Sequence, residues 1–449
     1  MSCWPRRHRA TSRVPTSIRT IAACLSLAAT LGIGCGGKRF VVSQPTSPYT
    51  PAPTGTFRAG VAQVDVTPHP GPPMFGHSTE GAGRAVGYQM RLRARAVAFE
   101  DEQGERAVLV QLDLGASSGL VHREVSRAVY DLGLNPARVL FAATHTHAGP
   151  GGIYSSRFYN EHAAGRPGFD RRLTTWVAGQ IERAIRAAVT DLKPARLLLG
   201  EELDVEVSRN RSLEAWAQNP SSPSGKIYPD KDTRLRILRI EQNVGGKDVP
   251  VGAIVSFSVH DTALSHHMEL YHPDLLGVAA RALETYVRKT TQKPFVAAFI
   301  NSAEGDVSPN WRKQGPDEAV RLGDALAASA VKAYAKAALL APPFPLRVGY
   351  REVDLPKQPT ALGPLCEKAM LGVPLIAGAE DGRSFLYGSA GVYEGRRRSK
   401  YGDKDCHGYK QQALSLIQKI VLPASKFVRT VPFHVLQLGN ALAFPSCRT

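Results

Sequence analysis

Apolar positions downstream of residue 57 follow two spacings, one typical of strands and one typical of helices. Residues 90–99 alternate apolar and polar side chains with a period of two, as a half-buried strand does. Further strands are predicted at residues 108–112, 138–143, 251–259, 295–300 and 433–444. Helical spacing covers residues 120–132, 173–192, 275–287 and 318–337. Strands alternating with helices predict an α/β domain with a mixed, largely buried sheet and flanking helices.

Three of the predicted strands are each followed directly by polar side chains that could do chemistry. The first group is Thr144-His145-Thr146-His147, the second begins at His260, and the third spans residues 301–310 and contains Ser308. Ligand sites in α/β sheets gather at the carboxyl ends of strands, so the three groups are expected to meet. His145 and His147 would point the same way in extended backbone, which suits two ligands of one metal ion, or one ligand beside one proton-transfer group. The alternatives are a structural histidine pair and, around Ser308, an ordinary turn.

The first 56 residues differ in composition from the rest of the chain. Residues 1–37 combine an arginine-rich start with a short apolar run, and Cys35 follows a small residue. This pattern predicts a signal peptide or lipoprotein leader, with Cys35 as a site for lipid attachment. Residues 38–56 are rich in Pro, Ser and Thr and predict a tether. The expected location is therefore periplasmic or extracellular, with an outer-membrane-anchored lipoprotein as one form of it.

Charge and cysteine content refine this picture. The net charge is +17, of which five arginines before Cys35 contribute five, leaving +12 on the rest. The basic residues are scattered, and no nucleic-acid-binding motif is present, so nucleic acid is not expected as a partner. A solvated basic surface or attraction to an anionic membrane remains. Beyond the leader three cysteines are left, and the best disulfide pair for an exported protein is Cys366 with Cys406.

Several blocks of the sequence, in order, resemble the neutral ceramidase family (neutral/alkaline non-lysosomal ceramidases). They include 57–68, the histidine block 144–152, Asn210-Arg211-Ser212, and the Gly-Asp-Val-Ser-Pro-Asn block at 305–310. The glycine turn at 377–382 is similar to a later block of the family. The resemblance implies a zinc-hydrolase catalytic domain over residues 57–449. It also implies hydrolysis of the amide bond of ceramide to sphingosine and a fatty acid.

The resemblance also implies roles for individual residues. His145 and His260 would be zinc ligands, His147 a catalytic partner near the metal, and Ser308 the essential serine. The serine would act as nucleophile or as hydrogen-bond partner of the intermediate, while zinc activates a water molecule. Two further residues, Arg211 and Asn210, would bind substrate.

The sequence departs from the family pattern near its last residue. The family continues after the proline that matches Pro445 with a glutamate and, later, a tyrosine that complete the zinc site, and then with an immunoglobulin-like domain. None of these follows here, so we expect a truncated catalytic domain. Asp261 is a candidate replacement ligand. The alternatives to a ceramidase are an impaired, lipid-binding surface lipoprotein and a zinc amidase or esterase for another acylated lipid.

Overall fold

The structure is a computed structural model, and it describes residues 49–78, 81, 83–219, 231–360, 363–400, 406–413, 423–440 and 442–447. The predicted leader, Cys35 and most of the predicted tether lie outside these residues. The described part of the tether stretch, 49–56, lies against the domain. The Arg106 guanidinium stacks 4.5 Å from the Tyr49 ring centre, and the Thr54 amide donates to the Glu102 carbonyl.

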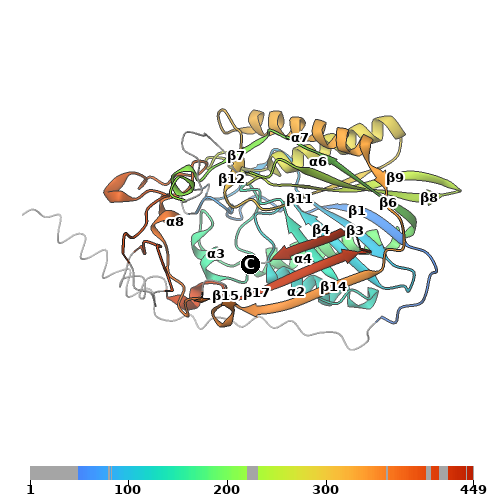
Figure 1. Cartoon of the computed structure of the whole chain (residues 1–449), viewed down its shortest axis with the longest axis horizontal. Coiled ribbons are helices and arrows are strands. Elements are labelled where there is room, and N and C mark those ends of the chain that lie inside the picture. The colour runs from blue at the N-terminus through green and yellow to red at the C-terminus, as the bar shows by residue number, and fades with distance from the viewer. Residues whose placement is uncertain are drawn as a thin grey trace, which may run out of the picture. The chain divides into compact units, whose positions relative to one another are not determined.

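The structure contains the predicted strands at 90–99, 108–112, 138–143, 251–259 and 295–300 and the four predicted long helices (Figure 1), whereas the strands at 193–202, 235–244 and 346–354 were not predicted. The strands are β1 (Arg58–Asp65), β2 (Gly87–Tyr88), β3 (Arg93–Glu100), β4 (Arg106–Leu112), β5 (Val139–Ala143), β6 (Lys193–Glu202), β7 (Ser208–Asn210), β8 (Leu235–Val244), β9 (Lys247–Phe257), β10 (Leu270–Tyr271), β11 (Val296–Asn301), β12 (Val307–Pro309), β13 (Ala338–Leu339), β14 (Leu346–Asp354), β15 (Pro359–Thr360), β16 (Gly363–Pro364), β17 (Thr430–Leu438) and β18 (Leu442–Cys447). The helices are α2 (Gly119–Ala128), α3 (Arg157–His162), α4 (Arg171–Thr190), α5 (Leu213–Trp216), α6 (Asp274–Thr291), α7 (Pro316–Lys336) and α8 (Val373–Ala377), with short 3₁₀ turns η2 (Tyr130–Leu132), η3 (Leu355–Lys357), η4 (Ser389–Gly391) and η6 (Ala424–Lys426).

The prediction of a single strand over 433–444 is wrong. Two antiparallel strands, β17 and β18, occupy this region and pair from Phe433–Cys447 to Leu438–Leu442. Gly439 lies between them with φ +59°, a left-handed conformation that lets the chain reverse. With β14 they form a separate three-stranded sheet.

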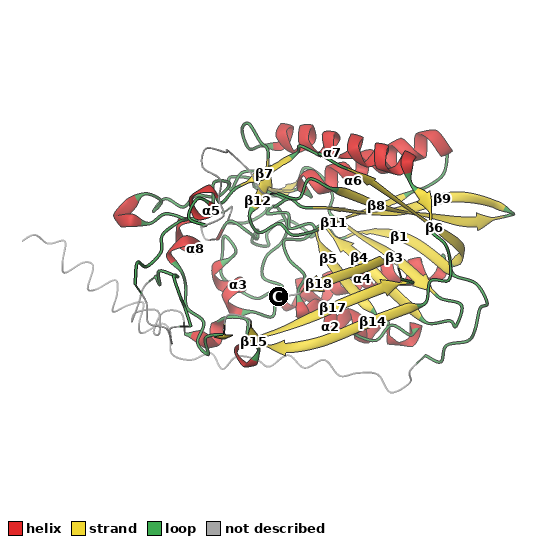
Figure 2. Cartoon of the chain, in the orientation of Figure 1, coloured by secondary structure: helices red, strands yellow, loops and turns green. Residues whose placement is uncertain are grey.

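A large mixed sheet organises the domain, as predicted. Its strand order is β11-β9-β8-β6-β1-β3-β4-β5, with β13 paired to β6. The pairs β4–β5 and β11–β9 are parallel, and the other pairs are antiparallel. Helices pack against the sheet (Figure 2): α4 packs on β1 and β3, and α7 packs on β6 and β8. Small residues permit this close packing, because a Cβ on Gly60 would lie 2.2 Å from the Ala188 carbonyl oxygen.

The sheet folds over, so that its two halves face each other. A Cβ on Gly252 of β9 would approach Val61 of β1 to 2.9 Å. Leu109, Leu197 and Ile254 belong to the buried apolar cluster between these halves. The two edge strands of the sheet, β5 and β11, run in opposite directions when the strand pairs are followed from one edge to the other. Because the sheet folds over, β11 nevertheless contacts β5. Twist between neighbouring strands accumulates across a wide sheet, and this allows the carboxyl ends of edge strands to meet.

The predicted disulfide between Cys366 and Cys406 is present, with a Cα–Cα distance of 5.2 Å. Among the described residues, no helix has both the length and the apolar character needed to cross a membrane.

Candidate active site

The three polar groups predicted at strand ends meet in the structure. Asn301, the last residue of β11, makes the link: its amide nitrogen donates to the carbonyls of Thr144 (3.0 Å) and Val259 (2.6 Å). The backbone amide of His260 donates to the carbonyl of Val307, the residue before Ser308 (2.7 Å). The segments after β5, β9 and β11 are therefore joined by hydrogen bonds.

Three imidazole rings converge at this junction. The Nε2 atom of His147 lies 3.3 Å from Nε2 of His145 and 3.1 Å from Nε2 of His260. Two nitrogens bound to one tetrahedral zinc ion at about 2.1 Å would lie about 3.4 Å apart. The donor set and its spacing therefore fit a single zinc ion held by three histidines. The structure brings together the two ligands implied by the family resemblance and also His147.

Two of the rings, those of His145 and His147, are oriented by different local features. His145 adopts φ +68°, and its Nδ1 bonds to the carbonyl of Gly115, which leaves Nε2 directed to the cluster. His147 packs against Gly76, where a Cβ would lie 2.3 Å from its Cγ. His77 stacks edge-on against His147, with 4.6 Å between ring centres. These contacts leave His147 little room to move.

Burial keeps the histidines neutral. It lowers the pKa of His145 to about 4 and the pKa values of His147 and His260 well below their ordinary value. Neutral imidazole is the form that binds a metal ion. The cluster is therefore ready to bind a cation at neutral pH.

Ser308 is fully buried on β12, which pairs with β7 opposite Arg209. Its hydroxyl donates to Oε1 of Glu380 (2.9 Å), and the Arg209 guanidinium donates to the same oxygen (2.6 Å). The hydroxyl is therefore held in one direction by a carboxylate. Ser308 and His260 are brought close by the backbone hydrogen bond at Val307.

The two residues predicted to bind substrate lie in different surroundings. Arg211 lines the cavity that contains the three histidines. It is also ion-paired with both carboxylate oxygens of Asp381, at 3.0 Å each, and donates to the Gly305 carbonyl. Asn210 is buried, and its side-chain oxygen accepts from the Ser212 amide (2.8 Å). Substrate binding by either residue remains a prediction.

The candidate replacement ligand Asp261 lies apart from the imidazole cluster. Its carboxylate is fully buried and accepts from the Leu276 amide near the start of α6 (3.3 Å). Among described residues, its oxygens do not join the imidazole group whose donor atoms lie within 4.8 Å of one another. The hypothesis that Asp261 is a ligand is wrong for this geometry, because its side chain is engaged by the helix.

The sequence reasoning missed four residues near the site. Glu304 lies 3.9 Å from His145 Nδ1, and burial raises the pKa of its carboxyl to about 8. His77 contacts His147, while Glu380 and Asp381 hold Ser308 and Arg211. The family-like glycine turn at 377–382 contained the two acids, but their partners are far away in sequence. The one sign in the sequence that these two acids matter was their place in a block that resembles the family.

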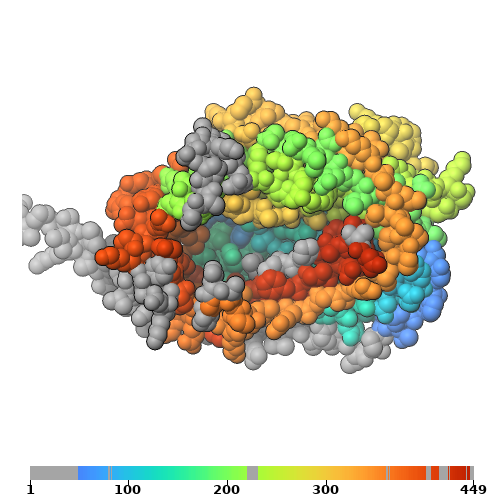
Figure 3. All heavy atoms as spheres, in the orientation of Figure 1, coloured from blue at the N-terminus to red at the C-terminus, as the bar shows by residue number. Residues whose placement is uncertain are grey.

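Two cavities adjoin the cluster. The first, about 530 Å³, contains all three imidazoles and is bounded by residues of segment 371–386. The second is a larger apolar hollow of about 740 Å³ between the large sheet and β18, lined by Leu109, Leu238 and Phe444 among others. Figure 3 shows a hollow between the red atoms and the yellow and green atoms above them, with teal atoms at its floor. His145, Phe75 and Tyr159 line both spaces.

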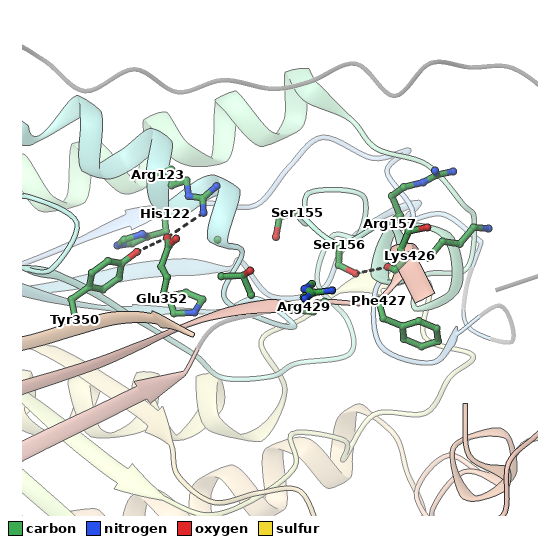
Figure 4. A pocket seen from close by; sticks show the side chains of 15 residues that line it. His122, Arg123, Ser155, Ser156, Arg157, Tyr350, Glu352, Lys426, Phe427 and Arg429 are labelled. Atoms are coloured by element: carbon green, nitrogen blue, oxygen red, sulfur yellow. Dashed lines mark hydrogen bonds and ion pairs between the residues drawn. The ribbon is translucent and has the colours of Figure 1, made fainter. Parts of the chain in front are cut away.

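A further cavity of about 250 Å³ lies away from the histidine cluster, beside α2 and β14 (Figure 4). Its cationic side chains have carboxylate partners. Arg123 pairs with Glu352 at 3.1 Å, and Lys426 pairs with Glu161 at 2.8 Å. We assign no chemistry to it.

Comparison with known proteins identifies the family of the chain. Residues 57–325 match the sequence profile of the family described as neutral/alkaline non-lysosomal ceramidase, N-terminal. Neutral ceramidase of Drosophila melanogaster is 31% identical over 271 residues, covering 57% of this chain and 36% of the relative. Neutral ceramidase of Pseudomonas aeruginosa is 33% identical over 260 residues, covering 57% of this chain and 37% of the relative. The matches thus span little more than a third of these relatives.

Solved structures extend the similarity to most of the chain. The crystal structure of neutral ceramidase from Pseudomonas aeruginosa superposes with a TM-score of 0.67 at 25% identity, covering 86% of this chain and 61% of that one. A structure titled as a ceramidase complexed with C2 gives a TM-score of 0.70 at 26% identity, covering 86% and 62%.

Proposed function

Because this chain belongs to the neutral/alkaline non-lysosomal ceramidase family, we propose that it hydrolyses the amide bond of ceramide, releasing sphingosine and a fatty acid. The observation that carries the proposal is the convergence of three neutral imidazoles beside a buried, carboxylate-held serine. Two cavities meet at this point, and both are lined mainly by apolar surface, as a lipid substrate requires.

The cofactor in this proposal is zinc, held through the Nε2 atoms of His145, His147 and His260. When bound, zinc polarises the amide carbonyl and lowers the pKa of a coordinated water towards about 7. The family resemblance gives His147 a catalytic place beside the metal, whereas the interatomic distances favour it as a third ligand. Measured zinc affinity of a His147 variant separates these two roles.

The remaining residues act through position and charge. The Ser308 hydroxyl proton is directed at Glu380, so a lone pair of its oxygen stays available as nucleophile, or its hydroxyl turns to donate to the intermediate. Asp381 neutralises Arg211, which otherwise would add a positive charge beside the metal site. The Gly115 carbonyl holds His145 in the tautomer that presents Nε2.

The apolar hollow suits one hydrocarbon chain of the substrate. Its lining mixes branched aliphatic side chains from β4, β6, β8 and β9 with Phe444 of β18. Because His145 borders this hollow and the histidine cavity, a chain bound there would place its carbonyl end near the cluster. We assign the fatty acyl chain to it.

Export from the cytoplasm is also part of this proposal. It is supported by the arginine-rich leader sequence and by the disulfide between Cys366 and Cys406, a bond typical of oxidising compartments. Anchoring through Cys35 is proposed on the sequence pattern alone.

Hydrolysis of a fluorescent short-chain ceramide tests the function. The purified full chain should release the labelled fatty acid when zinc is present and should stop when zinc is chelated. Ser308→Ala should abolish release while leaving the circular dichroism spectrum unchanged. A folded chain that binds zinc but releases no fatty acid would favour a lipid-binding protein. Release from other acylated lipids, but not from ceramide, would favour an amidase or esterase of different specificity.

A further inference from the structure

The segment from Leu371 to Lys400, called here the rim segment, borders the histidine cavity and exposes large apolar side chains. Leu375 is 64% exposed, Phe385 is 80% exposed and Leu386 is 38% exposed. Leu375 and Leu386 also line the cavity, so these side chains mark its edge. The free energy falls when such apolar side chains move from water into lipid. An exposed group of them is therefore typical of a surface that binds a membrane or another apolar partner.

The rim segment is folded and has a small buried cluster of its own, so its exposed apolar side chains do not result from a lack of structure. Leu371 and Ala413 are buried in a small cluster with Val373 and Ile376. The Ser384 amide donates to the Ala377 carbonyl (2.9 Å), which closes the turn that carries Phe385. Cys366, which forms the disulfide bond with Cys406, lies five residues before the segment. Figure 1 shows α8 and the orange-red chain after it at the left of the view, away from the tips of β8 and β9.

The exposed charge of the rim segment has a single sign. Its exposed charged residues are Arg383, Arg396, Arg397 and Lys400. Its three carboxylates are turned inward or half-buried, and two of them hold the site: Glu380 pairs with Arg209 and Asp381 with Arg211. An exposed apolar edge whose own exposed charges are all positive is complementary to an anionic lipid surface. Long arginine and lysine side chains suit the headgroup region.

We propose that the rim segment docks the cavity mouth onto a bilayer that contains anionic phospholipid, with Phe385 inserting among the lipids and the basic residues contacting headgroups. The inference rests on the proposed function, because a lipid substrate held in a bilayer must enter the cavity from that side. A second copy of the chain is the competing occupant. It fits less well, because the exposed positive charge of two identical rims would repel.

Sedimentation with vesicles tests the proposal on the full chain, so that its leader contributes equally to every sample. The probes are phosphatidylcholine vesicles with and without phosphatidylglycerol. Phe385→Ser should weaken binding by about tenfold. Arg396→Gln/Arg397→Gln should weaken it by roughly fivefold per residue, and only on vesicles with phosphatidylglycerol. The matched controls are Leu339→Ser, which removes an apolar side chain that is 61% exposed, and Arg288→Gln/Lys289→Gln at the end of α6.

The outcomes separate this inference from the proposed function. Phe385 and the two arginines lie outside the catalytic cavity lining, so their variants should hydrolyse soluble short-chain ceramide at the wild-type rate. Loss of vesicle binding in the rim variants alone supports the docking surface even if no hydrolysis is detected. Binding that is absent in wild type, or equal in rim and control variants, overturns it. Self-association that is lost on Phe385→Ser, without vesicle binding, also overturns it in favour of a second copy.

Discussion

Replacing Gly76 by alanine should disrupt the imidazole cluster without touching any donor atom. A Cβ at this position would lie 2.3 Å from Cγ and 2.6 Å from Nδ1 of His147. Relieving this overlap to a normal contact of about 3.5 Å requires the ring to move by roughly 1 Å. Metal–ligand distances tolerate deviations of only about 0.2 Å. The third imidazole would therefore leave the positions observed at 3.1 and 3.3 Å from its neighbours.

The chain offers a closely matched control. Gly71 has the same φ of +118° as Gly76, but a Cβ there would meet nothing within 4 Å. Both alanine variants therefore carry the backbone strain of about 1–3 kcal/mol expected for this conformation, and only Gly76→Ala carries the contact with His147. We expect zinc affinity, measured by competition with a chromogenic chelator, to fall at least about tenfold in Gly76→Ala relative to Gly71→Ala. Equal zinc affinity in the two variants would refute the reasoning.

Three further predictions concern charge, the disulfide and chain length. Asp381→Asn should lower the free energy of unfolding in urea by about 3 kcal/mol, because it breaks a buried ion pair in which one nitrogen of Arg211 contacts both carboxylate oxygens. Asp131→Asn, which breaks an exposed pair made through two nitrogens of Arg186, should cost less than about 1 kcal/mol; equal costs would show that burial of the Asp381 pair does not matter. Cys366→Ser/Cys406→Ser opens a loop with a sequence separation of 40, and should cost up to about 4 kcal/mol in the same assay; unchanged unfolding would show that packing alone holds the segment. Ala443→Trp narrows the apolar hollow and should reduce kcat/KM for long-chain relative to short-chain ceramide by about tenfold, whereas an unchanged ratio would place the acyl chain elsewhere.

Sequence periodicity predicted the four long helices, α2, α4, α6 and α7, because each has one buried face, but it did not predict the short helices α3, α5 and α8. α4, for example, buries Leu173, Val177, Ile181 and Ile185 at helical spacing. The polar groups after β5, β9 and β11 predicted that His145, His147 and His260 would meet, and they do. The expected cause, neighbouring parallel strands that end at one edge, does not apply to the whole sheet, because most of its strand pairs are antiparallel. The strand ends meet because the sheet folds over.

Contacts between distant segments were beyond the reach of sequence patterns. Glu380 holds Ser308 across 72 positions, and Asp381 holds Arg211 across 170. No spacing rule identifies such partners. The same limit explains the error about Asp261, since its place after His260 gave no sign that the start of α6 binds its carboxylate.

The central claim is that the three imidazoles form one zinc centre that hydrolyses an amide. The most direct test is a zinc titration of the chelated full chain, with bound metal and short-chain ceramide hydrolysis measured on the same sample. Hydrolysis should rise in proportion to zinc and reach its plateau at one zinc per chain, and His147→Ala should bind zinc at least about tenfold more weakly. Hydrolysis that persists without zinc, or zinc that binds with unchanged affinity after His147→Ala, would contradict it.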